Sequence, residues 1–344
     1  MTGYSALLAE LAVPRLVGSR NHGRVHAALV RELAARGFAV EEHRFPASTD
    51  ALWGAALWGA VLAWGALVAV PLAALPGTGL LLAGWVLGLE AGLLVLARAA
   101  SRGIRLTSQA LTGVNLVAAR PARPVAVWLT AHYDSKGQPI SMATRLLAVL
   151  LAGVGLAALL GLAVLRLRGA SGWEPVWSGL AAPAFLGGLL LSRSRPLDES
   201  PGAVDNATAL ITVFQTLDAL PSDAAIGVIF PDAEELGLLG ARALVEQRES
   251  LFAGTAVVNF DGIDDRGRPI ALIHRPGPTS DAVAERLQAI RFRWLPVLVD
   301  GRQFARAASE CVTILRGDWE TTRIVHTPRD AAERLTLEGV REVA

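Results

Sequence analysis

The sequence predicts an α/β protein whose mixed, mostly parallel sheet is flanked by helices and interrupted by four inserted transmembrane helices. Outside residues 51–97 and 146–192, short apolar runs typical of strands alternate with apolar residues at helical spacing. Inside those two ranges lie long apolar runs with almost no charge, each close to the ~20 residues that cross a bilayer. Together these observations favour a sheet-based domain with membrane-spanning insertions.

The composition indicates a chain that is only partly in water. Of 344 residues, 52% are hydrophobic and 18% are charged, whereas soluble domains carry about 25% charged residues. The net charge is +1, with no basic tail or stripe, so no nucleic-acid partner is expected. The one cysteine, Cys311, excludes an internal disulfide and a thiolate metal site, and its apolar neighbours predict a packed core thiol.

Residues 1–45 are predicted to be soluble and helical. Residues 27–36 have apolar side chains at helical spacing, and Gly37 is a plausible end of that helix. His22 and His26 stand four apart, but no glutamate follows His22, so the zinc-protease motif is absent. We expect both histidines on a solvated helix face and not as metal ligands. The first residues lack a basic-then-apolar pattern, so a cleaved signal peptide is not expected.

Two predicted transmembrane hairpins occupy residues 51–97 and 146–192. They comprise apolar runs at 51–75, 79–97, 146–165 and 175–192. Abundant Gly and Ala allow close helix packing in lipid, and Trp53, Trp173 and Trp177 are suited to the membrane interfaces. The alternative is two buried helical hairpins in a soluble core. Four nearly uncharged runs are hard to cover in one modest domain, so we predict four transmembrane helices.

Glu90 is the exception inside these spans. A carboxylate in lipid is costly, so this side chain would face the helix bundle or be protonated. Such a group more often marks local packing or a misplaced span than a polar path through the bundle, and we assign it no function.

The soluble stretches contain further predicted strands and helices. The strands are at 113–119, 125–131, 225–230, 256–260, 270–273 and 312–315. The helices are at 208–220, 236–248 and 280–290. Pro121 and Pro124 lie between the first two strands and predict a hairpin-like break there.

Acidic and imidazole side chains stand where these strands end or where a helix opens. They are His132, Asp134, Asp205, Glu234, Glu235, Asp261 and His326. In α/β proteins, function collects at the carboxyl ends of strands. By themselves, Glu234 and Glu235 could equally be an acidic first helical turn, which the helix dipole favours. Two histidines with several carboxylates and no cysteine suit a borderline ion, zinc above all.

The order of these groups, H-x-D, D-N, E-E, N-x-D and H-T-P-x-D, resembles peptidase family M28, the co-catalytic di-zinc aminopeptidases. The resemblance covers residues 1–45 and 105–335. It implies a zinc exopeptidase-like three-layer sandwich built from residues 1–45, 105–144 and 193–344. It also implies two Zn²⁺ ions per chain and a peptide substrate.

The resemblance further implies a set of metal ligands. Asp205 would bridge both ions. His132 and Asp261 would complete one site, and Glu235 and His326 the other. Three carboxylate ligands nearly cancel the charge of two dications, which leaves a modest positive excess to polarise a peptide carbonyl.

The same resemblance implies two further roles, and the chain departs from the family pattern at three places. Glu234 would be the general base that takes a proton from a metal-bound water, and Asp134 would orient the imidazole that precedes it.

Residues 207–209 read Ala-Thr-Ala where Ser-Gly is usual in the family, and Val325 stands where a tyrosine is common. The late S-D-H element reads Val-Asp-Gly over residues 299–301. These departures alter the predicted substrate pocket and leave the ligands in place.

These features predict a membrane-anchored di-zinc exopeptidase, most simply an aminopeptidase. Two alternatives stay open: a zinc-dependent amidohydrolase or acyl-transfer enzyme on the same scaffold, and a catalytically silent membrane assembly module. Glu234 speaks against the silent module, because a scaffold needs no base beside its metals. The sequence leaves the oligomeric state open.

The predicted hairpins each return the chain to the side that it left. That side carries arginines near the span ends, namely Arg44, Arg98, Arg102, Arg105, Arg145, Arg193 and Arg195, whereas the opposite loops carry Arg166 and Arg168. The positive-inside bias therefore predicts a multi-pass membrane protein with a cytoplasmic catalytic domain.

The second hairpin lies between His132 and Asp205, and the dozen residues that join it to Asp205 reach at most about 40 Å when extended. We therefore expect a site close to the bilayer, acting on membrane-associated peptides.

Overall fold

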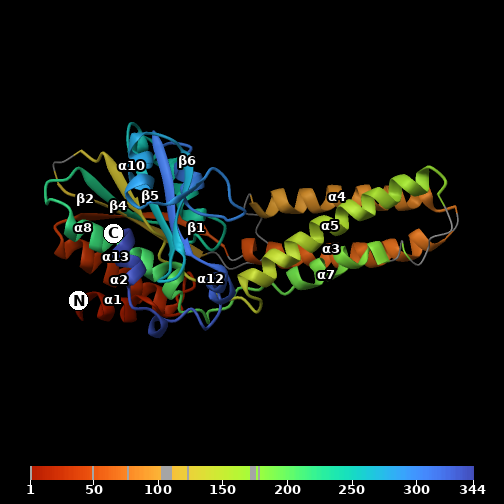
Figure 1. Ribbon diagram of the computed structural model, residues 1–344, viewed down its shortest axis with the longest axis horizontal. Helices are drawn as coiled ribbons and strands as arrows, with labels where there is room; N and C mark the ends of the chain where they lie inside the picture. The colour runs from red at the N-terminus through yellow and green to blue at the C-terminus, as the bar shows by residue number, and fades with distance from the viewer. Residues whose placement is uncertain are drawn as a thin grey trace. The chain divides into compact units, whose positions relative to one another are not determined.

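The computed structural model describes residues 2–48, 50–75, 77–101, 111–121, 124–170, 176 and 179–344. The chain folds into two compact units (Figure 1). The sheet unit comprises Met1–Ser48, Gln109–Gln138 and Leu197–Ala344, and the helical unit comprises Thr49–Ser108 and Pro139–Pro196. The chain thus leaves the sheet unit twice to build the helical unit.

One sheet forms the centre of the sheet unit. Its strands among the described residues are β1 (Ala39–Ala47), β2 (Leu111–Ala119), β3 (Val127–Thr130), β4 (Ile226–Phe230), β5 (Ala256–Ile263), β6 (Arg268–Arg275), β7 (Ile290–Phe292) and β8 (Glu310–Gly317). Their order is β1-β2-β4-β3-β5-β8-β6-β7. The middle strands β4, β3, β5 and β8 are parallel, whereas β1, β2 and β6 pair antiparallel with a neighbour. The predicted mixed, mostly parallel sheet is confirmed.

Helices cover both faces of this sheet, because side chains on the central strands alternate between two apolar cores. On β5, Val258 packs in one core and Val257 in the other. The first core includes side chains of α1 (Thr2–Leu11), α2 (Arg20–Ala35), α8 (Thr208–Ala219), α10 (Pro278–Arg286) and α13 (Glu338–Val343). The second includes those of α9 (Leu239–Gln247) and α11 (Gly301–Phe304). Three layers result, and α12 (Trp319–Ile324) follows β8 (Figure 1).

Two local predictions are wrong. β2 and β3 do not form a hairpin, because β4 lies between them and pairs with both. Residues 39–47, most of which were expected to be helical, form the edge strand β1, which pairs with β2 along its whole length. His43, Phe45 and Ala47 alternate into the interior from a run rich in charge, and this period of two was masked by the charges.

The helical unit contains α3 (Asp50–Ala74), α4 (Gly79–Ser101), α5 (Met142–Leu167) and α7 (Ala182–Leu191). Glycines bring these helices into backbone contact. A Cβ added at Gly188 would collide with the α3 backbone at Gly59 and Ala63, and one added at Gly155 would collide with Ala184 of α7. Small residues at crossings are typical of membrane helices, which associate through close packing.

Large apolar side chains cover the outside of the helical unit. Exposed examples are Trp64, Leu67, Leu80, Leu81, Val95 and Leu150. Among the described residues, three segments are long and apolar enough to cross a membrane: Trp53–Ala74, Gly79–Arg98 and Met142–Leu167. An exposed apolar surface of this kind suits lipid better than water, so the helical unit is consistent with a membrane protein.

The fourth predicted span is not confirmed. Within 175–192 the structure describes α7, whose 10 residues are too few to cross a bilayer alone. Residues 171–175 and 177–178, and with them Trp173 and Trp177, lie outside the described residues, as do Arg102 and Arg105. Glu90 lies half-buried in α4.

Candidate metal centre

The ends of the central strands bring the predicted site residues together. β4, β3 and β5 are adjacent and parallel, so the residues after their carboxyl ends lie at one edge of the sheet. Two groups of described side chains could each hold a metal ion, with ligand atoms within 4.8 Å of one another. The groups are His132, Glu234 and Asp261, and Asp205, Glu235 and His326. Both glutamates lie in a turn ahead of α9 and outside its first helical turn.

Asp205 lies between the two groups. Its Oδ1 is 3.1 Å from His132 Nε2, and its Oδ2 is 2.9 Å from His326 Nε2. On one side, Asp261 Oδ1 is 3.9 Å from His132 Nε2. On the other side, Glu235 Oε1 is 3.0 Å from His326 Nε2. The Asp205 carboxylate thus offers one oxygen to each group, which is the arrangement of a bridging ligand.

Asp134 connects the first histidine to the two glutamates. Its Oδ1 is 3.4 Å from His132 Nδ1. Its carboxylate oxygens accept the backbone N–H groups of Glu234 and Glu235, each at 3.1 Å. Asp134 is therefore placed to orient the imidazole, and it also fixes the turn that carries both glutamates.

Asn206 ties the loop of its neighbour Asp205 to strand β5. Its side-chain amide donates to the Phe260 carbonyl at 3.2 Å and accepts the N–H of Gly262 at 3.0 Å. Because Asp261 lies between those two residues, the bonds hold two candidate ligands in a fixed relation.

Two buried charged side chains, to which the sequence analysis gave no role, hold the same loop. Asp330 accepts two of its backbone N–H groups, at 2.7 and 3.1 Å, the second from Asp205. Arg15 is fully buried and donates to the carbonyls of Tyr133 at 2.7 Å and Gly202 at 3.0 Å. A guanidinium has enough donors to satisfy several carbonyls, so Arg15 joins the loop after β3 to the loop before α8.

Lys136 is a third residue that the sequence analysis missed. Its Nζ lies 2.5 Å from Glu235 Oε2 and 3.4 Å from the Glu235 carbonyl oxygen, and the side chain is buried. One signal was present, because Lys136 is the only lysine among the 32 lysines and arginines of the chain. Every other lysine-or-arginine position carries a planar guanidinium, so the lysine at 136 indicates a position that requires a compact ammonium.

Two residues at the candidate metal centre have a strained backbone. Ala233 has φ 57° and His326 has φ 63°, in the left-handed region that residues with a side chain rarely adopt. Conformations of this kind cost about 1–3 kcal/mol each and persist only where surrounding contacts hold them, which is common at functional sites.

The candidate ligands Asp205 and Glu235 are held as anions. Burial acts to raise the pKa of Asp205, but hydrogen bonds with His132 and His326 outweigh burial and hold this pKa well below its usual range. Burial also acts to raise the pKa of Glu235, yet the charges of His326 and Lys136 lower it to about 2. Both carboxylates therefore stay charged over the physiological range and attract a cation.

The pKa of Glu234 is shifted in the opposite direction, upward. Burial raises the pKa of Glu234 well above its usual range, against the opposing charge of His132. The carboxylates of Glu235, Asp261 and Asp300 raise it further. Of the two glutamates of the centre, Glu234 is therefore the one that more readily holds a proton, which suits an acid–base residue.

The donor set fits zinc. It combines two imidazoles with carboxylates and contains no thiolate. Glu235 Oε1 is buried and accepts no hydrogen bond, although it lies 3.0 Å from His326 Nε2, and a buried charged oxygen without a hydrogen bond is costly. A cation held by Asp205, Glu235 and His326 would satisfy that oxygen.

His22 and His26 take no part in this centre. His22 Nε2 lies 2.8 Å from Asp232 Oδ1, and its ring stacks on Tyr133 at 4.9 Å between centroids. His22 is buried, so the prediction of a solvated position is wrong for it, because this face of α2 packs onto the sheet. His26 is half-buried, with Nε2 3.3 Å from Glu42 Oε1.

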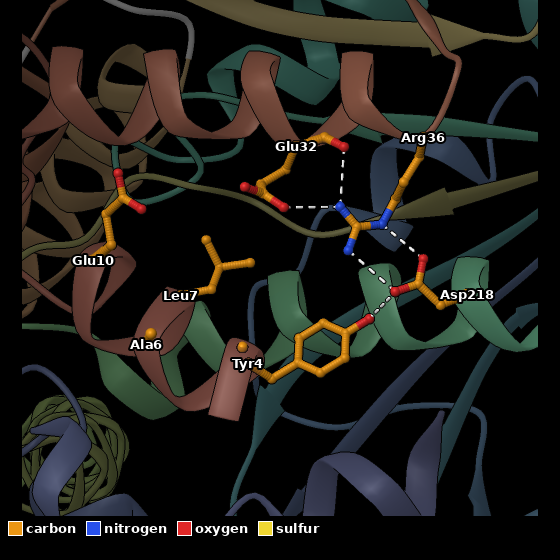
Figure 2. A pocket seen from close by; sticks show the side chains of 8 residues that line it. Tyr4, Ala6, Leu7, Glu10, Glu32, Arg36 and Asp218 are labelled. Carbon is orange, nitrogen blue, oxygen red and sulfur yellow. Dashed lines mark hydrogen bonds and ion pairs between the residues drawn. The ribbon is translucent and has the colours of Figure 1, made fainter. Parts of the chain in front are cut away.

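A separate hollow of about 480 Å³ lies between α1, α2 and α8 (Figure 2). Arg36 donates to Glu32 and Asp218 there, and the Tyr4 hydroxyl also donates to Asp218. Burial and the Asp218 carboxylate raise the pKa of Tyr4 to about 12. These polar groups satisfy one another, and none of the candidate ligands lines the hollow, so we assign it no part in the chemistry.

Comparison with known proteins supports the family resemblance. The sequence model of peptidase family M28 matches residues 192–344. This range contains Glu234 and all the candidate ligands named above except His132, which the fold brings to them. No curated protein matches the chain in sequence.

Solved structures with the same fold include two zinc peptidases and a cyclase. A zinc aminopeptidase from Bacillus subtilis is 14% identical with a TM-score of 0.55, covering 99% of this chain and 91% of that one. A Zn-dependent exopeptidase from Parabacteroides distasonis is 13% identical with a TM-score of 0.56, covering 99% and 94%. A glutaminyl cyclase from Porphyromonas gingivalis is 13% identical with a TM-score of 0.54, covering 99% and 94%. These likenesses show the fold, and with the family match they confirm the resemblance to family M28.

Proposed function

We propose that this protein is a membrane-anchored, zinc-dependent exopeptidase that removes residues from the N-terminus of peptides. The observation that carries the proposal is the Asp205 carboxylate, whose oxygens lie 3.1 and 2.9 Å from the Nε2 atoms of His132 and His326. We assign Asp205 as the ligand shared by two zinc ions, with His132 and Asp261 on one ion and Glu235 and His326 on the other. The match to family M28 and the zinc aminopeptidase fold support this assignment.

Glu234 is the proposed general base. Bound zinc would supply Lewis acidity, which acidifies the attacking water and polarises the scissile carbonyl. Glu234 lies in the same group as His132 and Asp261, where its carboxylate can take the proton of the water and pass it to the leaving amine. Its raised pKa favours this exchange, because a base with a pKa nearer neutrality both accepts and returns a proton.

Acyl transfer on the same scaffold is a second candidate. The glutaminyl cyclase shares the fold as closely as the Bacillus subtilis aminopeptidase does, at TM-scores of 0.54 and 0.55. In a cyclisation of this kind, the substrate's own amine replaces water as the nucleophile, and the same metal ligands would serve.

Metal analysis combined with a substrate panel tests both candidates. We expect the detergent-solubilised protein to hold two zinc ions per chain and to release the first residue of aminoacyl p-nitroanilides. A peptide with an N-terminal glutamine in the same panel reports cyclisation. Two bound zinc ions without either reaction would overturn both candidates and favour a silent membrane module.

We also propose that the substrates are the ends of membrane-associated peptides on the cytoplasmic side. The apolar helices of the helical unit and the arginine distribution in the sequence support this. One peptide, presented free and tethered to a lipid anchor, tests it. We expect faster cleavage of the tethered form, and a preference for the free peptide would contradict the proposal.

A further inference from the structure

The chain leaves the sheet unit for the second time after Gln138 and returns to it at Leu197. The excursion between these residues, Pro139–Pro196, contains α5 and α7. At its base, Gly137 and Leu197 form an antiparallel bridge. The Gly137 N–H donates to the Leu197 carbonyl at 2.6 Å, and the Leu197 N–H donates to the Gly137 carbonyl at 2.9 Å. We call this bridge the clasp, because it joins the two ends of the excursion.

The residues on either side of Gly137 contact two candidate zinc ligands. Before it, the Lys136 ammonium lies 2.5 Å from Glu235 Oε2. After it, the Gln138 N–H donates to the His326 carbonyl at 2.8 Å. Glu235 and His326 belong to the same group, with Nε2 of the histidine 3.0 Å from Oε1 of the glutamate. Three consecutive residues therefore connect the base of the excursion to two ligands of one proposed ion.

The backbone of His326 depends on contacts of this kind. Its φ of 63° lies in the left-handed region, and such conformations persist only where the surrounding structure holds them. The hydrogen bond from Gln138 fixes the carbonyl of this residue and so restrains its backbone. The start of the excursion thus helps to set the position of a candidate ligand.

The returning segment is packed closely against the clasp. A Cβ added at Gly137 would lie 3.2 Å from the Leu197 carbonyl oxygen, and 3.2 and 3.3 Å from the backbone nitrogens of Ser200 and Glu199. These separations are tighter than ordinary van der Waals contact. The same segment leads on to Asp205, the third residue of the group. Both ends of the excursion are therefore connected to the ligands of one ion.

Packing within the helical unit holds the other side of the excursion together. A Cβ added at Gly187 of α7 would collide with the Ala148 carbonyl oxygen and the Ala152 nitrogen of α5. The first half of α5 therefore lies against the second half of α7, and these are the halves that the chain connects to the clasp. The clasp and the packing of α5 on α7 thus restrain the same two connecting segments, 139–141 and 192–196.

We propose that the clasp positions Glu235 and His326 for zinc, so that their group binds its ion tightly only while the two ends of the excursion are joined. Metal loading is then coupled to the assembly of α5 on α7, and a chain whose excursion is open at its base holds this ion weakly. The inference rests on the zinc site of the function proposed above. It adds Gly137 and Leu197 as positioning residues that lie outside both groups of candidate ligands.

Gly137→Val tests the proposal. The added side chain would press on the backbone of residues 197–200 without replacing a ligand. We expect one zinc dissociation constant to rise by about 10–100-fold, the usual effect of disturbing residues that orient metal ligands. Competition with a chromogenic chelator measures the zinc constants of the detergent-solubilised chain, at a temperature at which circular dichroism shows that it is folded. Wild-type zinc constants in a variant whose zinc-free form melts at a lower temperature would show that the clasp only stabilises the fold, and would overturn the proposal.

Gly153→Val is the matched control. Gly153 lies in α5, inside the same excursion, and a Cβ added there meets no atom of the described chain within 4 Å. We therefore expect the same substitution to leave the zinc constants at their wild-type values. A comparable loss of zinc affinity in this variant would place the effect in the helix and not in the clasp, and would overturn the proposal.

Hydrogen exchange of the wild-type chain tests the coupling in the other direction and requires no variant to fold. Coupling between two sites is reciprocal, so bound zinc should hold the clasp closed. We expect zinc to slow exchange at Gly137, Gln138 and Leu197 more than at Ser309, whose N–H donates to the Thr255 carbonyl at 2.9 Å elsewhere in the sheet unit. Equal slowing at all four N–H groups, or none at the clasp, overturns the proposal.

These measurements require no turnover, so they separate the inference from the exopeptidase function. If no peptide is cleaved but Gly137→Val weakens zinc binding and Gly153→Val does not, the exopeptidase function fails and the clasp stands. If peptides are cleaved and Gly137→Val keeps the wild-type zinc constants, the function stands and the clasp fails. A chain that binds no zinc overturns both.

Discussion

At the scale of single residues, Lys136 shows how the centre distinguishes the two oxygens of one ligand. Its Nζ is 2.5 Å from Glu235 Oε2, whereas Glu235 Oε1 accepts no hydrogen bond and lies 3.0 Å from His326 Nε2. The ammonium neutralises one oxygen and leaves the other for an ion. The charges of His326 and of this ammonium together explain why Glu235 keeps its charge although it is buried.

We expect Lys136→Met to destabilise the zinc-free protein by about 3–5 kcal/mol, because the buried Glu235 carboxylate loses one partner of an ion pair and keeps only His326 to offset its charge. Zinc should recover a large part of this loss, because a bound ion neutralises the same carboxylate. Urea unfolding in detergent, with and without zinc, measures both values. The same loss in both states would show that Lys136 contributes only packing.

Glu234→Gln tests the proposed base. Glutamine keeps the shape of the side chain but cannot take a proton, so we expect kcat to fall by about 10²–10⁴-fold while the zinc content stays at the wild-type value. Turnover of an aminoacyl p-nitroanilide and elemental analysis of the same sample measure the two. Unchanged turnover excludes Glu234 as the base, and loss of zinc would make it a ligand instead.

The candidate ligands could be located from the sequence because polar residues stand out directly after apolar strands. Arg15 could not be found in this way. It binds the Tyr133 carbonyl 118 residues further along the chain, and nothing local distinguishes it from the other arginines. In the sequence, Asp300 stood out only as part of the Val-Asp-Gly segment that replaces the family's S-D-H element. Its burial without a hydrogen-bond partner among the described residues is a property of tertiary packing, which the sequence does not report.

At the scale of elements, a row of polar side chains crosses four neighbouring strands. Thr130 on β3 donates to Asn259 on β5 at 2.7 Å, and Asn259 donates to Thr313 on β8 at 3.3 Å. His274 Nε2 on β6 lies 2.9 Å from Thr313 Oγ1. These bonds connect strands of the sheet through side chains as well as through the backbone.

His274 should make stability depend on pH. Burial, aided by the charge of Arg302, lowers the pKa of His274 from 6.5 to about 4 in the folded protein. The unfolded chain therefore binds more protons than the folded chain between these values, so stability is unaffected above about pH 6.5 and falls as the pH drops toward 4. Allowing for partial exposure, the loss is about 1–3 kcal/mol. We expect His274→Gln to flatten this part of the profile in urea unfolding from pH 4 to 8, and an unchanged slope would contradict the assignment.

Central strands could be predicted from the sequence, whereas edge strands and strand order could not. β5 is buried almost throughout and reads as an apolar run. β7 has three residues and all are exposed, so the alternation of Ile290, Arg291 and Phe292 is too short to mark a strand and faces no buried core. The entry of β4 between β2 and β3 depends on pairing between segments far apart in the chain, which local pattern does not report.

At the scale of the whole molecule, the two units differ in what covers their apolar side chains. The sheet unit encloses most of its apolar residues in two cores, one on each face of the sheet, and exposes few large ones, among them Trp294, Leu298 and Trp319. The helical unit exposes many of its leucines, valines and tryptophans. Length and lack of charge mark such helices in the sequence, and three of the predicted spans coincide with described helices that are long and apolar enough to cross a membrane. The fourth could not be counted reliably, because α7 is short.

The predicted cytoplasmic position of the sheet unit can be tested with one cysteine. Cys311 is fully buried, and burial raises the pKa of its thiol, so the native chain should not react. We expect Glu249→Cys, at an exposed position of the sheet unit, to be labelled by a membrane-impermeant maleimide only after cells are opened. Labelling of intact cells would place the unit on the outer side, and the wild type is the control for background.

The buried position of Lys136 also decides how the protein can be handled. Since no other lysine exists in the chain, the folded surface presents no ε-amino group to a succinimidyl ester or an aldehyde. Fluorescent tagging, immobilisation on activated beads and amine-directed crosslinking will therefore find no side chain to couple, and an added surface thiol is the practical handle.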